Sequence, residues 1–418
     1  MARIVLVQDF LTNYRRPVFE ALQDELERRG HRFLVTSGRY QHSQPTQTID
    51  PAIAAQDLGG LNHIALDVRK LGPLKLYQLG NLLEPIDVVL VPAELSSCSW
   101  WIAALHRIRR SQLHPLQILM VGHGRNFNRS HAGLMSDLAY SMIAHIADGY
   151  LGYTESSRQT LLQLGFPEGR CLSFGQSKAI LALRKEVKTI RQGDLESLRS
   201  QLGLGSGPIA CFVGRLMPRK NLRLLVEAFD LVLGKKPDAQ LLILGEGPER
   251  DGLVEQAQSR PWLHCPGAAW GTELSQYLAV SDFQVSAGGV GLSILDGFAA
   301  EHPLITVMHP DHAPDVDYLR PGYNGLLCEA SAGKLAYTVL SLLNRPETLL
   351  KMQKAAAASL EGHGLKPLAN RLADGIERLS ELGCRSSASR GRGLAKGLWN
   401  TLTQPPKLTL AHPQRSEN

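Results

Sequence analysis

Residues 209–248 read IACFVGRLMPRKNLRLLVEAFDLVLGKKPDAQLLILGEGP, and this stretch decides the fold. Two apolar runs, 209–213 and 241–244, each end in a glycine, and a helical pattern lies between them from Asn221 to Leu233. A strand, a helix and a second strand in this order predict a parallel βαβ unit. Such units bind ligands in the crevice beyond the carboxyl ends of their strands.

Two cations, Arg215 and Lys220, follow the first of these strands. An arginine offers a planar fork for two phosphate oxygens, and a lysine near a helix start adds a mobile point charge. Asn221 is expected to cap the helix, whose free N–H groups also favour anions. This arrangement predicts that a phosphorylated nucleotide binds here. Ordinary solvated surface charges are the alternative reading of the same pair.

The size and composition of the chain fit an ordinary globular protein with two domains. It has 418 residues, of which 44% are hydrophobic and 20% charged. No stretch approaches the roughly 20 apolar residues that a membrane helix needs. The start, residues 1–7, reads as a first strand rather than as a signal peptide. The six cysteines have no paired spacing for zinc or redox chemistry, and a reducing cytosol fits them.

The net charge of +6 is unevenly placed along the chain. The segment 384–418 alone carries six basic residues and one acid, so the rest of the chain is close to neutral. A nucleic-acid-binding body would carry a basic face of its own, and we therefore expect no nucleic-acid partner. We expect the tail to be disordered, or to touch a membrane surface through Trp399 and the cations near it.

Strand and helix patterns alternate in both halves of the chain, which predicts an α/β fold with two doubly wound, Rossmann-like domains. The expected division is a first domain, a linker with the first helix of the second domain, the second domain, a C-terminal helix and the basic tail. In residue numbers these are 1–175, 176–206, 207–360, 361–383 and 384–418.

A second glycine-rich turn lies in residues 285–305, VSAGGVGLSILDGFAAEHPLI. Glycines before a helix start let backbone N–H groups approach an anion or sugar hydroxyls closely. Asp296 falls near the start of that helix, where its carboxylate could accept hydrogen bonds from a ribose. The alternative for Asp296 is an acid that only complements the helix dipole.

These motifs resemble retaining glycosyltransferases of the GT-B fold, specifically glycosyltransferase family 4. The resemblance covers roughly residues 1–380 and is most specific over 211–327. It implies two domains that face a cleft, a sugar nucleotide as donor, and no cofactor or metal. Residues 245–250 resemble the loop that lines the nucleotide pocket, and 263–267 resemble the loop that reads the base. The implied nucleotide-sugar contacts are Gly214, Gly245, Gly247, Gly289, Val290, Gly291, Leu292, Ser293 and Asp296, and the implied diphosphate clamp is Arg215 with Lys220.

The chain departs from the family pattern at one glutamate. Members of the family usually read E-G-F-G-L-P-x-L-E-A here, whereas this chain has Gly288 at the first glutamate and Asp296 at the second. Glycine cannot replace a carboxylate that contacts the donor sugar. A degenerate protein that binds a nucleotide sugar without turnover is therefore an alternative to the transferase. A nucleotide-sugar epimerase or a phosphorylase of the same fold is another.

The N-terminal half also carries family landmarks. Residues 14–19, YRRPVF, resemble the start of enzymes that build surface polysaccharides, and 122–124, GHG, resemble one of their turns. The resemblance implies that His123 contacts the donor sugar or phosphate, with a purely structural histidine as the alternative. The implied acceptor-side residues are Tyr14, Arg15, Arg125 and Asn126.

A competing metal motif, Asp315-Val316-Asp317, can be set aside at this stage. Paired acids can hold a divalent ion against a diphosphate. This pair follows Pro314 in an expected loop rather than an apolar strand.

Together with the family resemblance, the sequence predicts a metal-independent hexosyltransferase that uses a UDP- or GDP-sugar and a glycan acceptor, free or lipid-linked. We expect it in the cytoplasm, at the inner face of the membrane.

Overall fold

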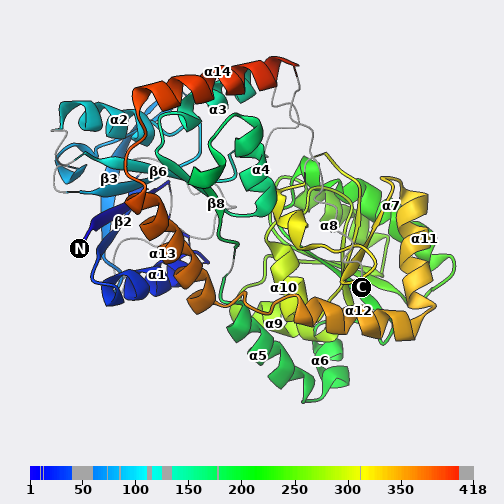
Figure 1. The fold of residues 1–418 in the computed structure, drawn as a ribbon. Coiled ribbons are helices and arrows are strands. Elements are labelled where there is room, and N and C mark those ends of the chain that lie inside the picture. Colours follow the sequence, from blue (N-terminus) through cyan, green and yellow to red (C-terminus); the bar gives the residue numbers. More distant parts are fainter. Residues whose placement is uncertain are drawn as a thin grey trace, which may run out of the picture. The chain divides into compact units, whose positions relative to one another are not determined.

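The structure, a computed structural model, describes residues 1–9, 11–12, 14–39, 60–72, 74–83, 86–110, 115–124, 134–176, 178–310 and 312–403. The chain divides into two compact units, each built on its own sheet (Figure 1). Unit 1 contains residues 1–178 and the described residues from Leu365 onward, and unit 2 contains residues 179–364. Two doubly wound α/β units confirm the fold class that the sequence predicts.

Unit 1 holds an eight-stranded sheet in the order β4-β3-β2-β1-β5-β6-β7-β8. All neighbouring strands run parallel except β3 and β4. The strands are β1 Arg3–Gln8, β2 Arg32–Arg39, β3 His63–Leu71, β4 Leu74–Tyr77, β5 Val88–Pro92, β6 Gln117–Gly122, β7 Gly149–Gly152 and β8 Cys171–Ser173. The central strands β5 and β6 are buried along their whole length, because parallel sheets are covered on both faces.

Helices cover both faces of the first sheet (Figure 1). One face packs against α2, α3 and α4, and the other against α1 and α13. The helices of unit 1 are α1 Arg16–Arg28, α2 Ser99–Arg109, α3 Leu134–Ala144, α4 Glu155–Gln163, α13 Leu365–Glu381 and α14 Ser387–Thr403, with 3-10 turns η1 Gly80–Leu83 and η2 Glu168–Arg170.

Unit 2 holds a six-stranded parallel sheet in the order β11-β10-β9-β12-β13-β14. The order reverses between β9 and β12, which is the switch point where such sheets bind ligands. The strands are β9 Ile209–Val213, β10 Gln240–Leu244, β11 Leu263–Gly267, β12 Phe283–Ser286, β13 Leu304–Val307 and β14 Gly325–Cys328.

The helices of unit 2 also cover both faces of their sheet. One face packs against α7, α8 and α11, and the other against α5, α6 and α9. These elements are α5 Ile180–Arg191, α6 Leu195–Gln201, α7 Leu222–Leu233, α8 Arg250–Gln258, α9 Gly271–Val280, α10 Ser293–Ala299, α11 Ala332–Leu343 and α12 Pro346–Ala358, with 3-10 turns η3 Pro218–Lys220 and η4 Pro314–Tyr318.

After unit 2 the chain returns to unit 1. Helix α13 packs along α1, and Arg29 pairs with Asp374 at 2.6 Å and with Glu377 at 2.5 Å. The expectation of a disordered tail is wrong for 387–403, which form α14 against α3. Among the described residues, no helix is long and apolar enough to cross a membrane.

Candidate functional site

Three glycine-containing turns meet at the carboxyl ends of β9, β10 and β11. Gly214 donates its backbone N–H to Leu244 O at 3.0 Å, and Gly245 donates to Gly267 O at 2.8 Å. A Cβ atom at Gly245 would lie 1.8 Å from the Gly214 carbonyl oxygen, so only glycine permits this approach. A Cβ atom at Gly247 would likewise lie too close to its neighbour, 2.3 Å from the Leu216 carbonyl oxygen. The predicted nucleotide glycines are therefore brought together.

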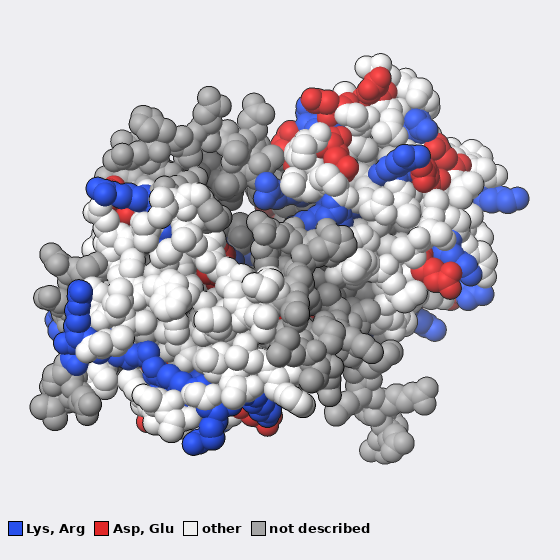
Figure 2. Space-filling model, turned by 90° about the horizontal axis from the view of Figure 1, so that it is seen from above, with Lys and Arg blue, Asp and Glu red and all other residues white. Residues whose placement is uncertain are grey.

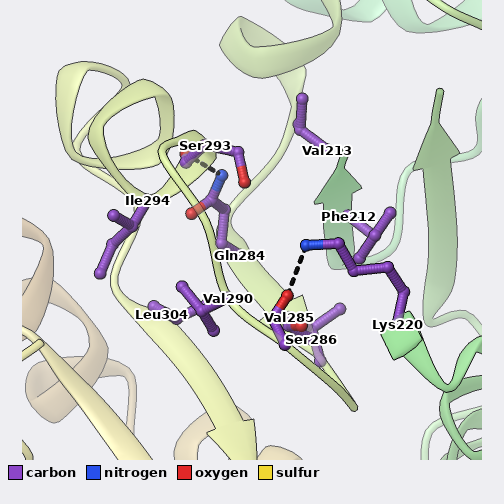
Figure 3. Close-up of a pocket in the computed structure, with 11 residues that line it drawn as sticks. Phe212, Val213, Lys220, Gln284, Val285, Ser286, Val290, Ser293, Ile294 and Leu304 are labelled. Carbon is purple, nitrogen blue, oxygen red and sulfur yellow. Dashed lines mark hydrogen bonds between the residues drawn. The ribbon is translucent and has the colours of Figure 1, made fainter. Parts of the chain in front are cut away.

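Lys220 lies among these turns and is 6% exposed. Its Nζ donates a hydrogen bond to Gly289 O, the carbonyl of the second glycine turn (Figure 3). Burial lowers the pKa of Lys220 to about 8, and the charge of Arg219 acts in the same direction. A small cavity lies beside the ammonium, lined among others by Phe212, Ser286, Val290 and Ser293. The lysine thus lies at the edge of a pocket formed at the switch point, and with this pKa it still carries its charge at pH 7.

The turn at Gly288 explains why no glutamate stands there. Gly289 donates its N–H to Arg219 O at 2.9 Å, which presses the turn against the segment before α7. A Cβ at Gly288 would lie 2.4 Å from Arg219 O and 2.5 Å from Lys220 C. Those neighbours are backbone atoms that a side chain cannot push aside at low cost. Position 288 therefore has no room for any side chain in this conformation.

His312 holds the other end of the same turn, a contact that no sequence motif indicates. Val290 donates its N–H to His312 Nδ1 at 3.0 Å, and His312 Nε2 lies 2.8 Å from Val307 O. The acceptor role of Nδ1 requires the neutral ring with its proton on Nε2, which then donates to Val307 O. Ala313 N–H donates to Val290 O at 2.9 Å. A lone histidine in a loop carries no motif that could have revealed this contact.

Three other predicted residues of unit 2 have mixed outcomes. Arg215 directly follows Gly214 and is exposed. Asp296 lies in the first turn of α10 and is 4% exposed, so its role toward a ribose stays a prediction. The expected cap is wrong, because Asn221 occupies the N-cap position of α7 without a side-chain cap bond. It instead adopts the left-handed conformation, with φ 50°, that joins η3 to α7.

The remaining predicted contacts of this turn, Gly291, Leu292 and Ser293, run from the glycine turn into the start of α10. A Cβ at Gly291 would lie 3.9 Å from Lys220 Nζ, which places this glycine beside the ammonium. The metal motif lies close to the same turn: Asp315 and Asp317 belong to the 3-10 turn η4, which follows His312 and Ala313. Asp315 is 4% exposed, and its charge opposes the lowering of the Lys220 pKa.

In unit 1, His123 lies directly after β6, where the carboxyl ends of the strands meet. Its ring contacts the Tyr153 ring edge-on, with the centroids 4.8 Å apart. Its Nδ1 lies 3.4 Å from Ser157 Oγ. Burial, together with the charge of Arg15, lowers the pKa of His123 to about 3. The ring is therefore uncharged near pH 7, and it can donate one hydrogen bond and accept another.

Arg15 also lies against the Tyr153 ring, and its charge acts on His123. Its guanidinium carbon lies 5.4 Å from the centre of the Tyr153 ring and 5.9 Å from that of Tyr14. One of its nitrogens donates to Gln8 Oε1 at 2.8 Å. The structure thus brings together His123, Arg15 and Tyr14, three of the predicted residues of this half. Arg125 and Asn126 lie outside the described residues.

Comparisons with known proteins bear on this geometry. Residues 195–359 match the family model described as glycosyl transferases group 1. The alpha-monoglucosyldiacylglycerol synthase of Acholeplasma laidlawii is 24% identical over 40% of this chain and 42% of that protein. The protein of the same name from Streptococcus pneumoniae is 30% identical over 36% of this chain and 34% of its own length. The chain therefore spans less than half of the length of these curated relatives.

A solved structure extends the likeness to nearly the whole chain. Anabaena HepE, in complex with UDP-glucose, matches 90% of this chain and 100% of its own with a TM-score of 0.66. Its sequence is 13% identical, so the match shows the fold alone. The family model covers α6 to α12, the part of unit 2 that contains the glycine turns and Lys220. Residues 195–359 thus match the glycosyl transferases group 1 family, and the resemblance to GT-B glycosyltransferases that the sequence suggested is confirmed.

Proposed function

We propose that this protein is a retaining glycosyltransferase that moves a sugar from a UDP- or GDP-sugar to a growing glycan in polysaccharide or glycolipid synthesis. The placement of Lys220 carries the proposal, because a buried lysine beside three glycine turns is suited to a diphosphate. The family match supports a transferase, the relatives named as glucosyldiacylglycerol synthases support a lipid-linked acceptor, and HepE is a GT-B neighbour that holds UDP-glucose.

The chemistry follows from the charges at the site. A bound diphosphate favours the charged form of Lys220, so the lysine keeps its proton above pH 8 as well. Together with Arg215 it neutralises the leaving nucleotide diphosphate as the bond between the sugar and phosphate breaks. The acceptor hydroxyl attacks from the face that the diphosphate leaves, and the departing phosphate oxygen takes the hydroxyl proton. We assign Asp296 to the ribose, the turn 289–293 to the sugar and phosphate, and neutral His123 to a hydrogen bond with the donor sugar.

The decisive measurement is a screen of the purified protein against UDP-, GDP- and ADP-sugars with EDTA present. Saturable binding of one donor with release of its nucleotide diphosphate would support a metal-independent transferase and identify the donor. Binding without release, even with membrane lipid extracts as acceptor, would indicate the degenerate binding protein. Conversion of the donor without any acceptor would indicate the epimerase.

A double variant tests the diphosphate clamp directly. Arg215→Ala with Lys220→Ala should abolish measurable UDP or GDP affinity in calorimetry while the unfolding temperature stays close to that of the wild type. The matched control is Arg223→Ala, on α7, with Lys235→Ala, just after α7, which removes the same two charge types from exposed positions. Equal affinity in the two double variants would refute the clamp.

A further inference from the structure

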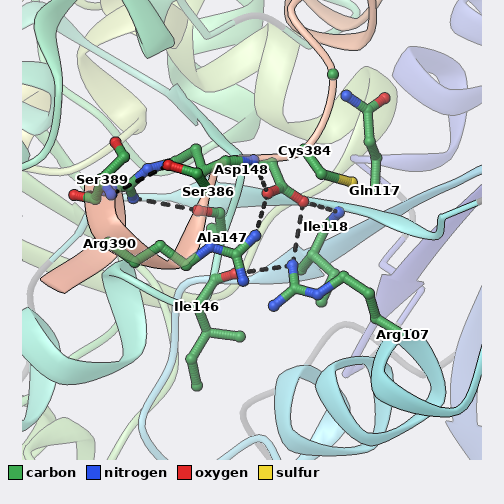
Figure 4. A network of polar contacts seen from close by, with 12 residues as sticks. Arg107, Gln117, Ile118, Ile146, Ala147, Asp148, Cys384, Ser386, Ser389 and Arg390 are labelled. Carbon is green, nitrogen blue, oxygen red and sulfur yellow. Dashed lines mark hydrogen bonds and ion pairs between the residues drawn. The ribbon is translucent and has the colours of Figure 1, made fainter. Parts of the chain in front are cut away.

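Helix α14 is fixed to unit 1 by a buried acid. The Asp148 side chain is fully buried and accepts hydrogen bonds from Ile118 N at 3.0 Å, Arg107 Nη1 at 3.2 Å and Arg385 N at 2.8 Å (Figure 4). It also pairs with Arg390 of α14. Because Arg107 belongs to α2, one carboxylate ties α2 and α14 to the same side of the sheet.

Two glycines let α14 lie very close to its neighbours. A Cβ at Gly397 would lie 2.1 Å from Leu164 O and 2.3 Å from Ser141 Oγ, and one at Gly393 would lie 2.7 Å from His145 Cε1. The glycine face therefore points inward, against α3 and the end of α4. This contact fixes which face of α14 is exposed to solvent.

The exposed face of α14 carries Arg392, Lys396 and Trp399, four and three positions apart, and the Trp399 side chain is 69% exposed. Spacings of three and four place residues on one side of a helix. Arg390 is not part of this face, because its side chain forms an ion pair with buried Asp148. The sequence-based expectation that the tail cations act as one group is thus refined to two of them.

The neighbouring helices add apolar side chains to the same side of unit 1. Helix α2 exposes a stripe of large apolar side chains, and α3 exposes two methionines. The inner faces of both helices pack on the same core. The exposed apolar residues are Trp101 at 50%, Leu105 at 54%, Ile108 at 79%, Met135 at 78% and Met142 at 53%. Figure 2 shows a row of Lys and Arg side chains across this side of unit 1, among a wide area of uncharged residues.

The chemistry of this surface singles out one kind of partner. The sequences of α2, α3 and α14 contain a single carboxylate, Asp137, which is 4% exposed. Exposed cations without acids complement an anionic surface. The large aliphatic and thioether side chains between them gain free energy in a lipid interface and gain nothing against nucleic-acid phosphates.

We propose that the exposed faces of α2, α3 and α14 form a docking surface for an anionic phospholipid bilayer. Arg392 and Lys396 contact the lipid phosphates, and Trp399, Leu105 and Ile108 insert at the boundary between the headgroups and the acyl chains. The surface rests on the proposed function in one respect: a lipid-linked acceptor would be presented at that bilayer.

The test uses the full chain and vesicles of two compositions, phosphatidylcholine alone and equal parts of phosphatidylcholine and phosphatidylglycerol. The wild type should co-sediment with the anionic vesicles and weakly or not at all with the neutral ones. Arg392→Gln with Lys396→Gln should weaken that binding roughly thirtyfold, since each cation near an anionic surface contributes about fivefold. Trp399→Ala should weaken it roughly tenfold through lost apolar insertion.

A matched control comes from α12 of unit 2, which exposes Leu350, Lys351 and Lys354. Lys351→Gln with Lys354→Gln, and Leu350→Ala, should leave vesicle binding unchanged. No wild-type binding to anionic vesicles, equal losses in the α12 and α14 variants, or tighter binding to duplex DNA than to vesicles would each overturn the surface. UDP affinity is measured on the same preparations: vesicle binding without any nucleotide binding would refute the proposed function and leave the surface standing.

Discussion

Each unit places a cation at the carboxyl end of its sheet, and the surroundings lower the pKa of one and raise that of the other. Lys220 in unit 2 bonds to the Gly289 carbonyl, and burial brings its pKa down to about 8. Arg15 in unit 1 lies against the rings of Tyr14 and Tyr153 and keeps its charge. The neighbour of the arginine, His123, is the group that gives up its proton instead.

The difference teaches what each cation can do. Above pH 8 a lysine with this pKa takes up a proton when an anion arrives, so in that range its charge depends on binding. A guanidinium cannot be neutralised in a protein, so Arg15 offers a permanent charge that needs no proton. Unit 2 is therefore built to respond to its ligand, and unit 1 to offer a constant field.

The largest expected effect tests how the Lys220 side of this comparison is assembled. Gly288→Ala should lower the free energy of unfolding by about 2 to 3 kcal/mol, because the new Cβ meets the backbone of residues 219–220. The same strain should displace the Gly289 carbonyl from Lys220 and weaken UDP affinity. Chemical denaturation and calorimetry of the variant measure both effects.

A second glycine of the same turn provides the control. Gly291→Ala adds the same methyl group, but its nearest neighbour is Lys220 Nζ at 3.9 Å, an ordinary contact. Its free energy of unfolding should match that of the wild type within about 0.5 kcal/mol. If Gly288→Ala were as stable as Gly291→Ala, the steric reason for the missing glutamate would be wrong.

Much of unit 2 could be predicted from sequence because its local signals agree with one another. The apolar run 209–213 coincides with β9, and the helical pattern from Asn221 to Leu233 is α7 but for its first residue. Buried parallel strands leave continuous apolar runs, and an amphipathic helix leaves a period of 3.6. The glycine turns followed from those boundaries.

The missed features depend on contacts between distant residues. Gly393 and Gly397 lower helix propensity, so the sequence alone favours a disordered tail. Packing on Leu164 and Ser141 instead stabilises α14. The strand β3 is hard to predict from sequence, because it lies toward the edge of the sheet and alternates polar and apolar residues only partly. His312 and the crowding at Gly288 appear only once the turns are brought together.

The next prediction concerns proton uptake by Lys220. In the free protein the pKa of Lys220 is about 8, and a bound diphosphate raises it, so the charged form binds and the neutral form does not. UDP affinity should be constant below pH 8 and fall up to about tenfold per pH unit above it. Isothermal titration between pH 6.5 and 9.5 in buffers of different ionisation enthalpy would also count the protons taken up.

Two variants separate Lys220 from other titrating groups. Lys220→Met should lose roughly 100-fold in affinity at pH 7, because a charge-assisted hydrogen bond to phosphate is gone. It should also lose the decline above pH 8, whereas Lys235→Met, at an exposed position after α7, should keep both. A decline that persists in Lys220→Met would assign it to another group, such as the nucleotide itself.

The smallest expected effect lies in unit 1 and tests whether Arg15 acts on His123 as a constant charge. Desolvation is the larger cause of the low pKa of His123, and the charge of Arg15 is the smaller one. Arg15→Gln should therefore raise the pKa of His123 above 3 while leaving it below the ordinary value of 6.5, and Arg15→Lys should leave it nearly unchanged. An NMR titration of labelled imidazole nitrogens follows this ring directly. A pKa that returns fully to 6.5 in Arg15→Gln would mean that the charge of Arg15, not burial, keeps His123 neutral. The fixed charge of Arg15 would then set the protonation state of its neighbour.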